Sequence, residues 1–228
     1  MEIRVAADPQ AAAEDAAVRV ARQLRNAVRR RGSATIAVSG GSTPALMFAA
    51  LSAAADVPWQ LVQLWQVDER VAPDDDPARN AHLLTGLPLA PRQIHRMAVT
   101  TRDLRAAARR YAAGLPERFD IVHLGLGDDG HTASWPPGDP VVDVAEPVAL
   151  SGVFNGFVRM TLTPQVVNAA RHRLVLAPGA AKAGPMQHWL LGDATLPIQR
   201  VRRADTVVVI DTAAAAQLGA ATPVDDAR

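Results

Sequence analysis

A glycine-rich turn in the middle of the chain places two acids beside a histidine. The apolar run at residues 121–126 is too short for a helix and predicts a buried strand. Three glycines at its end allow a sharp turn, which carries Asp128, Asp129 and His131. Carboxylates and a histidine at the carboxyl end of a strand are typical of an active site in an open α/β sheet, so His131 is the leading candidate for chemistry.

The same glycines, at 125, 127 and 130, also satisfy G-x-G-x-x-G, the fingerprint of dinucleotide binding. Asp128 and Asp129 would place two carboxylates where a pyrophosphate should lie. Pro136 and Pro137 also prevent a long helix from opening there to present N–H groups to phosphate. We therefore expect no nicotinamide or other cofactor.

A second glycine motif follows a predicted strand at residues 35–38. The sequence SGGSTP begins at Ser39 and leads into a predicted helix, so its free N–H groups suit a phosphate, with Gly40, Gly41 and Ser42 as candidate contacts. The motif lacks the G-K-[ST] of a Walker A loop and the glycine pattern of a nucleophile elbow. A tight strand–helix connection is the alternative.

Charged residues also follow two other predicted strands. Asp68 and Arg70 end the strand predicted at residues 61–67, which suggests a site there. Lys182 follows the strand predicted at 173–177 and is the only lysine among 24 basic residues. A compact ammonium fits a phosphate pocket differently from a planar guanidinium, which favours a functional role over chance survival of a surface lysine.

Alternating strands and helices must position these residues. We predict strands at residues 3–5, 35–38, 61–67, 94–97, 121–126, 173–177 and 206–210, two strand-like runs at 141–150 and 153–162, and helices at 11–31, 45–54, 80–84, 101–113, 164–170, from Lys182 to 191, and 212–218. The pattern predicts an α/β fold with a doubly wound, mostly parallel, Rossmann-like sheet. A single domain would span residues 1–228, with a frayed tail at 219–228. The carboxyl ends of parallel strands share one edge, so the motifs should face one cleft.

The first predicted helix contains two features to test against structure. Val18, Leu24 and Val28 are expected to face inward. The run Arg29-Arg30-Arg31 at its end is either an anion patch or, more commonly, a solvated helix end stabilised by the macrodipole.

Composition narrows the function classes. The 228 residues include 49% hydrophobic ones, enough for a large core, and the formal net charge of +1 favours neither nucleic acid nor membrane. Without cysteine, no disulfide, thiolate nucleophile or thiolate metal site exists. The acids at 74–76 lack the spacing of oxygen ligands, so we expect a polar loop and no metal. With no signal or membrane-spanning pattern, we expect a soluble cytoplasmic protein, a monomer or weak homo-oligomer.

Taken in order, these motifs resemble the glucosamine-6-phosphate isomerase/6-phosphogluconolactonase family, in particular its lactonases. The resemblance covers nearly the whole chain and rests on SGGSTP at 39–44, DER at 68–70 with Asn80 downstream, LGLGDDGHTAS at 124–134, RMTLTP at 159–164 and PGAAK at 178–182. It implies hydrolysis of 6-phosphogluconolactone in the pentose phosphate pathway, in the cytosol and without a metal. The implied partner is a small phosphosugar lactone.

The resemblance also implies a role for each matched residue. His131 would be the general base that activates water. Arg70 and Lys182 would hold the substrate phosphate beside the glycine loop, while Asp68 and Asp129 would line the sugar pocket and orient groups around the histidine. Arg159 matches an arginine of the family whose role we leave open among the substrate contacts.

The sequence departs from the family pattern in two places. Arg79 stands where the family usually has serine, which leaves the packing of its loop open. Trp135-Pro136-Pro137 replaces the more usual leucine–phenylalanine–proline, and the change is expected to alter the pocket wall without affecting the chemistry.

Two rival functions remain. Deaminases of this superfamily carry a glutamate five residues after the histidine as part of a proton relay, but this chain has Pro136 there, which moves no proton. A regulator that senses sugar phosphates would need no poised histidine and usually carries a DNA-binding module, for which the sequence gives no signal.

Overall fold

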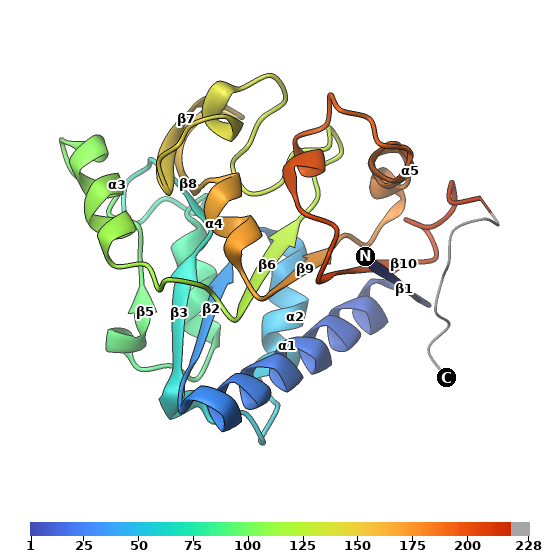
Figure 1. Ribbon diagram of the computed structural model, residues 1–228, viewed down its shortest axis with the longest axis horizontal. Helices are drawn as coiled ribbons and strands as arrows, with labels where there is room; N and C mark the ends of the chain where they lie inside the picture. Colours follow the sequence, from blue (N-terminus) through green and yellow to red (C-terminus); the bar gives the residue numbers. More distant parts are fainter. Residues whose placement is uncertain (220–228) are drawn as a thin grey trace.

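The computed structural model describes residues 1–219, without the side chain of Ser42. Its central sheet has seven strands in the order β1-β10-β9-β6-β2-β3-β5 (Figure 1). The strands are β1 (Glu2–Ala6), β2 (Ala34–Val38), β3 (Val62–Gln66), β5 (Ile94–His95), β6 (Ile121–Gly125), β9 (His172–Leu176) and β10 (Thr206–Asp211). All six neighbouring pairs are parallel, which confirms the predicted α/β sheet.

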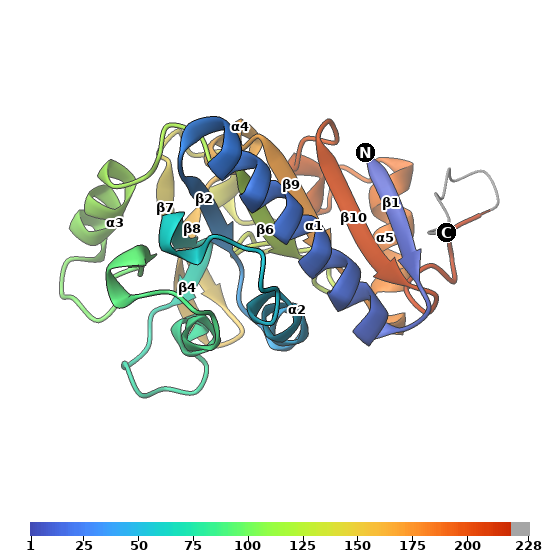
Figure 2. The same cartoon turned by 90° about the horizontal axis from the view of Figure 1, so that it is seen from below.

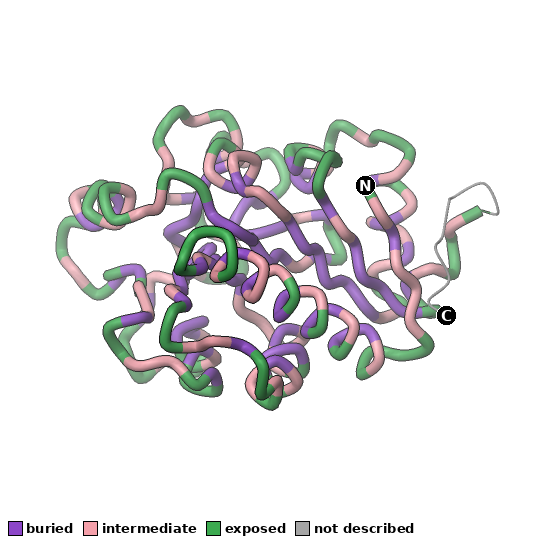
Figure 3. Tube along the Cα trace, turned by 60° about the horizontal axis from the view of Figure 1, so that its bottom comes forward, coloured by how far each residue is buried: buried purple, intermediate pink, exposed green. Residues whose placement is uncertain are grey.

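Helices and a second sheet cover the two faces of this sheet. On one face lie α1 (Pro9–Arg31) and α2 (Ser42–Ser52); the core on the other face includes α3 (Leu104–Ala113), α4 (Pro164–Ala169) and α5 (Ala183–Leu191) (Figure 2). Alternate strand residues serve the two layers: Ile121 packs toward α1 and Val122 toward the opposite core. The inner strands are therefore covered on both faces and read as nearly continuous apolar runs, and Figure 3 shows that most of their residues are buried.

Short 3₁₀ helices complete the described chain. They are η1 (Trp59–Leu61), η2 (Asn80–Gly86), η3 (Pro91–Gln93), η4 (Pro140–Val142), η5 (Ala180–Lys182) and η6 (Pro197–Arg200). Among residues 1–219, no helix combines the length and apolar character needed to cross a bilayer.

Local sequence signals set the ends of α1. The Asp8 carboxylate accepts a hydrogen bond from the Ala11 N–H, and Gly32 closes the helix at a φ of 79°. The expectation for Val18 is wrong, because its side chain is 64% exposed while Leu24 is fully buried. Alanines make up most of the buried face of α1, so the positions of the larger apolar residues do not by themselves predict which face is buried.

The segment after β3 does not extend the central sheet, contrary to the prediction that Asp68 and Arg70 end its third strand. They belong to β4 (Asp68–Arg70), which pairs antiparallel with β8 (Phe157–Leu162), and β8 pairs in turn with β7 (Val148–Phe154). Val67 is the joint: its N–H donates to Val38 of the central sheet, and its carbonyl accepts from Leu162 of the second. A change of sheet of this kind depends on long-range pairing and leaves no local sequence signal.

Other predicted elements differ in extent. Within 141–150, the structure has η4 and only the start of β7. Pro140 and the hydrogen bond that the Val141 N–H donates to the Asp139 carboxylate favour a turn there. The predicted helix at 212–218 is a series of turns. The helix expected at 80–84 is the 3₁₀ helix η2, and the strand at 94–97 stops at residue 95. Of the tail predicted at 219–228, all but residue 219 lies outside the described residues.

His123 of β6 gives the fold a dependence on pH. Its ring is fully buried, edge-on to Phe48 of α2 with 6.2 Å between ring centroids, and burial lowers its pKa from 6.5 to about 3. Between pH 6.5 and about 3, His123 therefore binds a proton in the unfolded chain but not in the folded chain. We expect the free energy of unfolding to fall as the pH drops below 6.5 towards 3, by up to about 1.4 kcal/mol per pH unit.

Urea unfolding of His123→Leu between pH 7.5 and 4.5 checks this expectation. The variant should lose part of the acid destabilisation, while the exposed His82→Leu should keep it. Equal pH slopes in His123→Leu and in the unchanged protein would show that His123 does not carry the effect.

Candidate active site

A cleft of about 210 Å³ opens at the carboxyl edge of the central sheet. Its walls come from the segments after β2, β6 and β9 and from the second sheet. Seven of the nine residues predicted from the sequence line it: Gly40, Gly41, Asp68, Arg70, His131, Arg159 and Lys182. Of the other two, Asp129 lies behind His131, and the predicted contact from Ser42 falls on a side chain outside those described.

His131 is held by the acid two residues before it. The Asp129 Oδ1 lies 2.5 Å from the imidazole Nδ1 and 3.1 Å from the backbone nitrogen of His131, which donates to it. A Cβ at Gly127 would overlap the imidazole, so only glycine allows this ring position. With Nδ1–H donating to Asp129, the other ring nitrogen is free to accept a proton.

The expectation that Asp129 lines the sugar pocket is wrong. Asp128 lines the cleft, whereas the Asp129 carboxylate turns toward the imidazole and borders a neighbouring hollow beside Pro136. Partial burial raises the pKa of Asp129, but the hydrogen bonds from His131 outweigh it and hold the pKa below 3.8. Asp129 is therefore suited to orient the histidine as a carboxylate.

Asp68 is the buried acid of the cleft, with 4% of its surface exposed. Its Oδ2 accepts a hydrogen bond of 2.6 Å from the Ser134 hydroxyl. Burial raises the pKa of Asp68, although the Ser134 bond and Arg159 oppose the shift. Its carboxyl group can exchange hydrogen bonds with a hydroxyl group in the cleft.

Two cations from different elements line the cleft. Arg70 of β4 donates to the Asn80 Oδ1 over 2.9 Å and to the Ala78 carbonyl. Lys182 ends η5, directly before α5, and its backbone N–H donates to the Gly179 carbonyl. The Arg70 guanidinium is therefore held by side-chain contacts, whereas the contact of Lys182 holds only its backbone. Both residues line the cleft, where their positive charges favour an anionic substrate group.

The glycine loop approaches the same wall closely. A Cβ at Gly40 would overlap the Asn80 side chain, so this glycine lets β2 and η2 approach each other. Gly41 has a φ of 119° and is the N-cap of α2, without a side-chain cap. Ser42 is the first helical residue. The uncapped N–H groups of α2 remain available to an anion.

Phe154, at the tip of the β7–β8 hairpin, was missed by the sequence analysis. Its ring lies 5.0 Å from the guanidinium carbon of Arg159 and 5.0 Å from the His131 ring centroid, edge-on to the imidazole. The turn Asn155-Gly156, with φ of 48° and 83°, returns the chain directly after it. An Asn-Gly pair predicts such a hairpin, but only the tertiary packing shows that this hairpin lies beside the active-site cleft.

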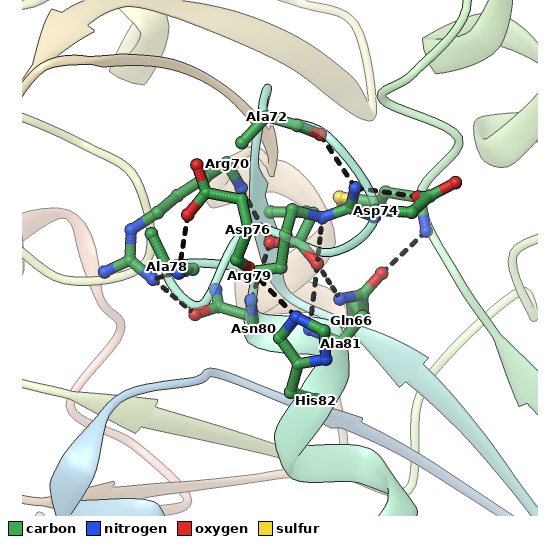
Figure 4. A network of polar contacts seen from close by, with 12 residues as sticks. Gln66, Arg70, Ala72, Asp74, Asp76, Ala78, Arg79, Asn80, Ala81 and His82 are labelled. Carbon is green, nitrogen blue, oxygen red and sulfur yellow. Dashed lines mark hydrogen bonds and ion pairs between the residues drawn. The ribbon is translucent and has the colours of Figure 1, made fainter.

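A second group missed from the sequence is the buried Glu69, which organises the loop that carries Arg79 and Asn80, both labelled in Figure 4. Its carboxylate accepts hydrogen bonds from the Gln66 side chain and from the backbone N–H groups of Arg70, Asn80 and Ala81, all 2.8–2.9 Å long. Arg79 completes the shell, with its Nε 3.2 Å from Glu69 and its Nη1 donating to Ala72 and Asp74. The unusual Arg79 therefore closes the loop that presents Asn80 and Arg70.

Replacing Arg79 by Ala is expected to lower the free energy of unfolding by about 1–3 kcal/mol, because Glu69 would lose a charged partner while its other hydrogen bonds remain. Displacement of Asn80 should also raise KM for a phosphorylated substrate. Urea unfolding and steady-state kinetics measure the two effects. The exposed Arg92→Ala serves as the control, and a variant at 79 that matches it in both measurements would contradict the role of the ion pair.

The segment Trp135-Pro136-Pro137 does not line the cleft, contrary to expectation: Pro136 and Pro137 border the neighbouring hollow, and Trp135 lies in the core. Its side chain is fully buried in the core, where Nε1 donates to the Leu162 carbonyl over 2.8 Å. Among residues 1–219, no three histidine or acidic side chains gather closely enough to hold a metal ion.

Comparison with known proteins assigns the chain that forms this cleft to a family. A model described as glucosamine-6-phosphate isomerases/6-phosphogluconolactonase matches residues 7–210. The chain belongs to this family. It is 36% identical to a 6-phosphogluconolactonase of Streptomyces coelicolor, with 92% of each chain covered.

Solved structures agree on the fold of the glucosamine-6-phosphate isomerase/6-phosphogluconolactonase family. A 6-phosphogluconolactonase of Shewanella baltica superposes with a TM-score of 0.83 at 27% identity, covering 92% of this chain and 97% of the other. A monomeric glucosamine-6-phosphate deaminase reaches 0.82 at 19% identity, covering 95% of this chain and 100% of the other. The second likeness shows the shared fold alone, so the choice of reaction within the family depends on the residues of the cleft.

Proposed function

We propose that this chain hydrolyses 6-phospho-D-glucono-1,5-lactone to 6-phosphogluconate, with His131 as the general base. The observation that carries the proposal is the imidazole held by Asp129 in a cleft that also contains Arg70 and Lys182. A base and two cations in one cleft suit a substrate that carries both an ester and a phosphate group. The identity to a bacterial 6-phosphogluconolactonase supports the same reaction.

The mechanism needs a water molecule and a base, because the lactone carbonyl is already electrophilic. The free imidazole nitrogen of His131 takes a proton as the water oxygen attacks the carbonyl carbon. The resulting imidazolium, stabilised by Asp129, returns that proton to the ring oxygen as the carbon–oxygen bond breaks. The Asp68 carboxyl would bind a sugar hydroxyl.

The negative charge on the carbonyl oxygen needs a donor during this step. Arg159 is 4% exposed, and its buried Nε has no hydrogen-bond partner within the described chain. Its guanidinium is fixed by Phe154, whose ring it covers and whose carbonyl it contacts over 3.3 Å. Arg159 is therefore a candidate for the oxyanion, and the N–H groups of the glycine turn are the alternative.

Hydrolysis of freshly prepared 6-phosphogluconolactone, followed by acid release in the presence of a chelator, tests the function. The rate must be compared with spontaneous hydrolysis, since the lactone opens unaided. A rate above the spontaneous one that is proportional to enzyme concentration is expected. A purified, folded protein that adds nothing to the spontaneous rate would overturn the proposal.

Deamination is the rival reaction on this fold. The position of the relay glutamate is occupied by Pro136, which is buried and carries no proton. We expect glucosamine-6-phosphate to yield no ammonia above background in a coupled assay, with an authentic deaminase as the positive control. Enzyme-dependent ammonia release comparable to lactone hydrolysis would reverse the assignment.

The proposal extends to the setting of the enzyme. A phosphosugar lactone is the partner, without nucleic acid or membrane, and the protein acts in the cytoplasm as a monomer or weak homo-oligomer. It uses no cofactor and no metal. Light scattering of the purified protein measures the oligomeric state.

A further inference from the structure

A second cleft lies at the opposite edge of the central sheet, where the parallel strands begin. Its volume is about 430 Å³, and the last turns of α1 form one wall. Figure 1 shows that α1 ends beside the start of β2. The segments that lead into β6, β9 and β10 form the rest of the cleft. Four arginines and a histidine line it: Arg30, Arg31, Arg118, Arg171 and His172. Since the active-site cleft lies at the carboxyl ends of the same strands, the two are separated by the length of the sheet.

A buried carboxylate holds two of these arginines in place. Asp120, whose side chain is 7% exposed, lies 2.5 Å from the Arg31 Nη2 and 3.4 Å from the Arg171 Nε through the same oxygen. Its other oxygen accepts from the Thr35 N–H over 2.8 Å. The acid therefore forms a floor that orients two guanidinium groups, whose remaining N–H groups can bind another acceptor.

The remaining arginines stand on the rim. Arg118 is anchored by its Nε, which donates to the Ala169 carbonyl over 2.9 Å. Arg30 is exposed and has no ion pair with any described residue. Asp205, the other acid of the lining, pairs with Arg202 over 3.1 Å. The lining thus carries four guanidinium groups against two carboxylates, and the second carboxylate is already paired with an arginine outside the lining.

We propose that this cleft is a second anion site that binds a diphosphate group. Two oriented arginines and two on the rim can give each phosphate a pair of charge-assisted hydrogen bonds, and the excess of positive charge matches a polyanion. The carboxyl end of α1 lies in the wall, where the helix dipole disfavours an anion, so binding depends on the arginines themselves. Of the run at residues 29–31, Arg30 and Arg31 thus belong to this site, whereas Arg29 lies outside the lining.

Calorimetric titration with inorganic pyrophosphate, in buffer without divalent metal, tests the site. The titration uses the variant Arg70→Ala/Lys182→Ala, so that binding at the catalytic cleft does not contribute and the result does not depend on the proposed reaction. We expect one binding event with a Kd that rises with sodium chloride concentration. Adding Arg30→Glu should weaken binding at least tenfold, and adding Arg171→Ala should weaken it further.

The matched control is Arg22→Glu in the same background, which makes the same charge change at another exposed position of α1. It should bind pyrophosphate nearly as tightly as its parent. Arg30→Glu alone carries the test if Arg171→Ala fails to fold, because Arg30 has no partner to lose. No heat at millimolar pyrophosphate, or equal affinity in Arg30→Glu and Arg22→Glu, would refute the proposal.

Competition between pyrophosphate and adenosine diphosphate then identifies the source of the diphosphate. If adenosine diphosphate displaces bound pyrophosphate at a comparable concentration, the site is assigned to nucleotides. If adenosine diphosphate does not displace it, the site is assigned to the free pyrophosphate ion. In either case Arg30→Glu in the otherwise unchanged protein should keep its rate of lactone hydrolysis.

Discussion

Replacing His131 by Asn is expected to lower kcat for lactone hydrolysis by a factor of about 10²–10⁴, the usual contribution of a positioned general base. Asparagine keeps polarity and approximate size, but it cannot take a proton from water. The hydrogen bond to Asp129 shows that the imidazole is already oriented before substrate binds. KM should change little, because the lost interaction belongs to the transition state.

The chain provides a matched control for this experiment. His188 also places its Nδ1 near an aspartate, 3.1 Å from Asp193, but on the surface of α5. His188→Asn should keep the full rate. If His131→Asn is folded by circular dichroism and retains a near-normal kcat, the base lies elsewhere, with Asp68 as the next candidate.

Replacing Lys182 by Ala should weaken binding of the phosphorylated lactone by about 2–4 kcal/mol, the cost of breaking a buried charge-assisted contact. This corresponds to roughly a thirty- to thousandfold rise in KM if KM follows binding. Lys182→Arg should restore only part of the loss, since a planar fork cannot occupy the place of a compact ammonium. Arg70→Ala should have a similar effect, because both cations line the cleft.

The unphosphorylated gluconolactone is the control substrate for Lys182→Ala. Its kinetics should be nearly the same in the variant and in the unchanged protein, so that the preference for the phosphorylated lactone collapses. If the variant keeps both its KM and this preference, the phosphate lies elsewhere, and the exposed N–H groups at the start of α2 become the first alternative.

The sequence by itself determined the features that depend on neighbouring residues. The alternation of apolar runs and helix signals predicted the α/β sheet, and the cap at Asp8 and the glycine at 32 gave the limits of α1. The motifs at strand ends indicated most of the cleft, because the carboxyl ends of parallel strands meet at one edge whatever the details of packing. Local backbone chemistry was sufficient for each of these conclusions.

Only the tertiary structure decided where side chains from distant segments meet. The pairing of β4 with β8 brought Arg159 opposite Arg70, and the hairpin placed Phe154 between Arg159 and His131. Likewise, the sequence showed Arg79 only as a loop residue that departs from the family pattern. The structure shows that it forms an ion pair with the buried Glu69. Asp120 gathers arginines from positions 31 and 171, an arrangement that no local pattern encodes. Contacts of this kind depend on long-range packing, in which the same residue types can be solvated, structural or functional.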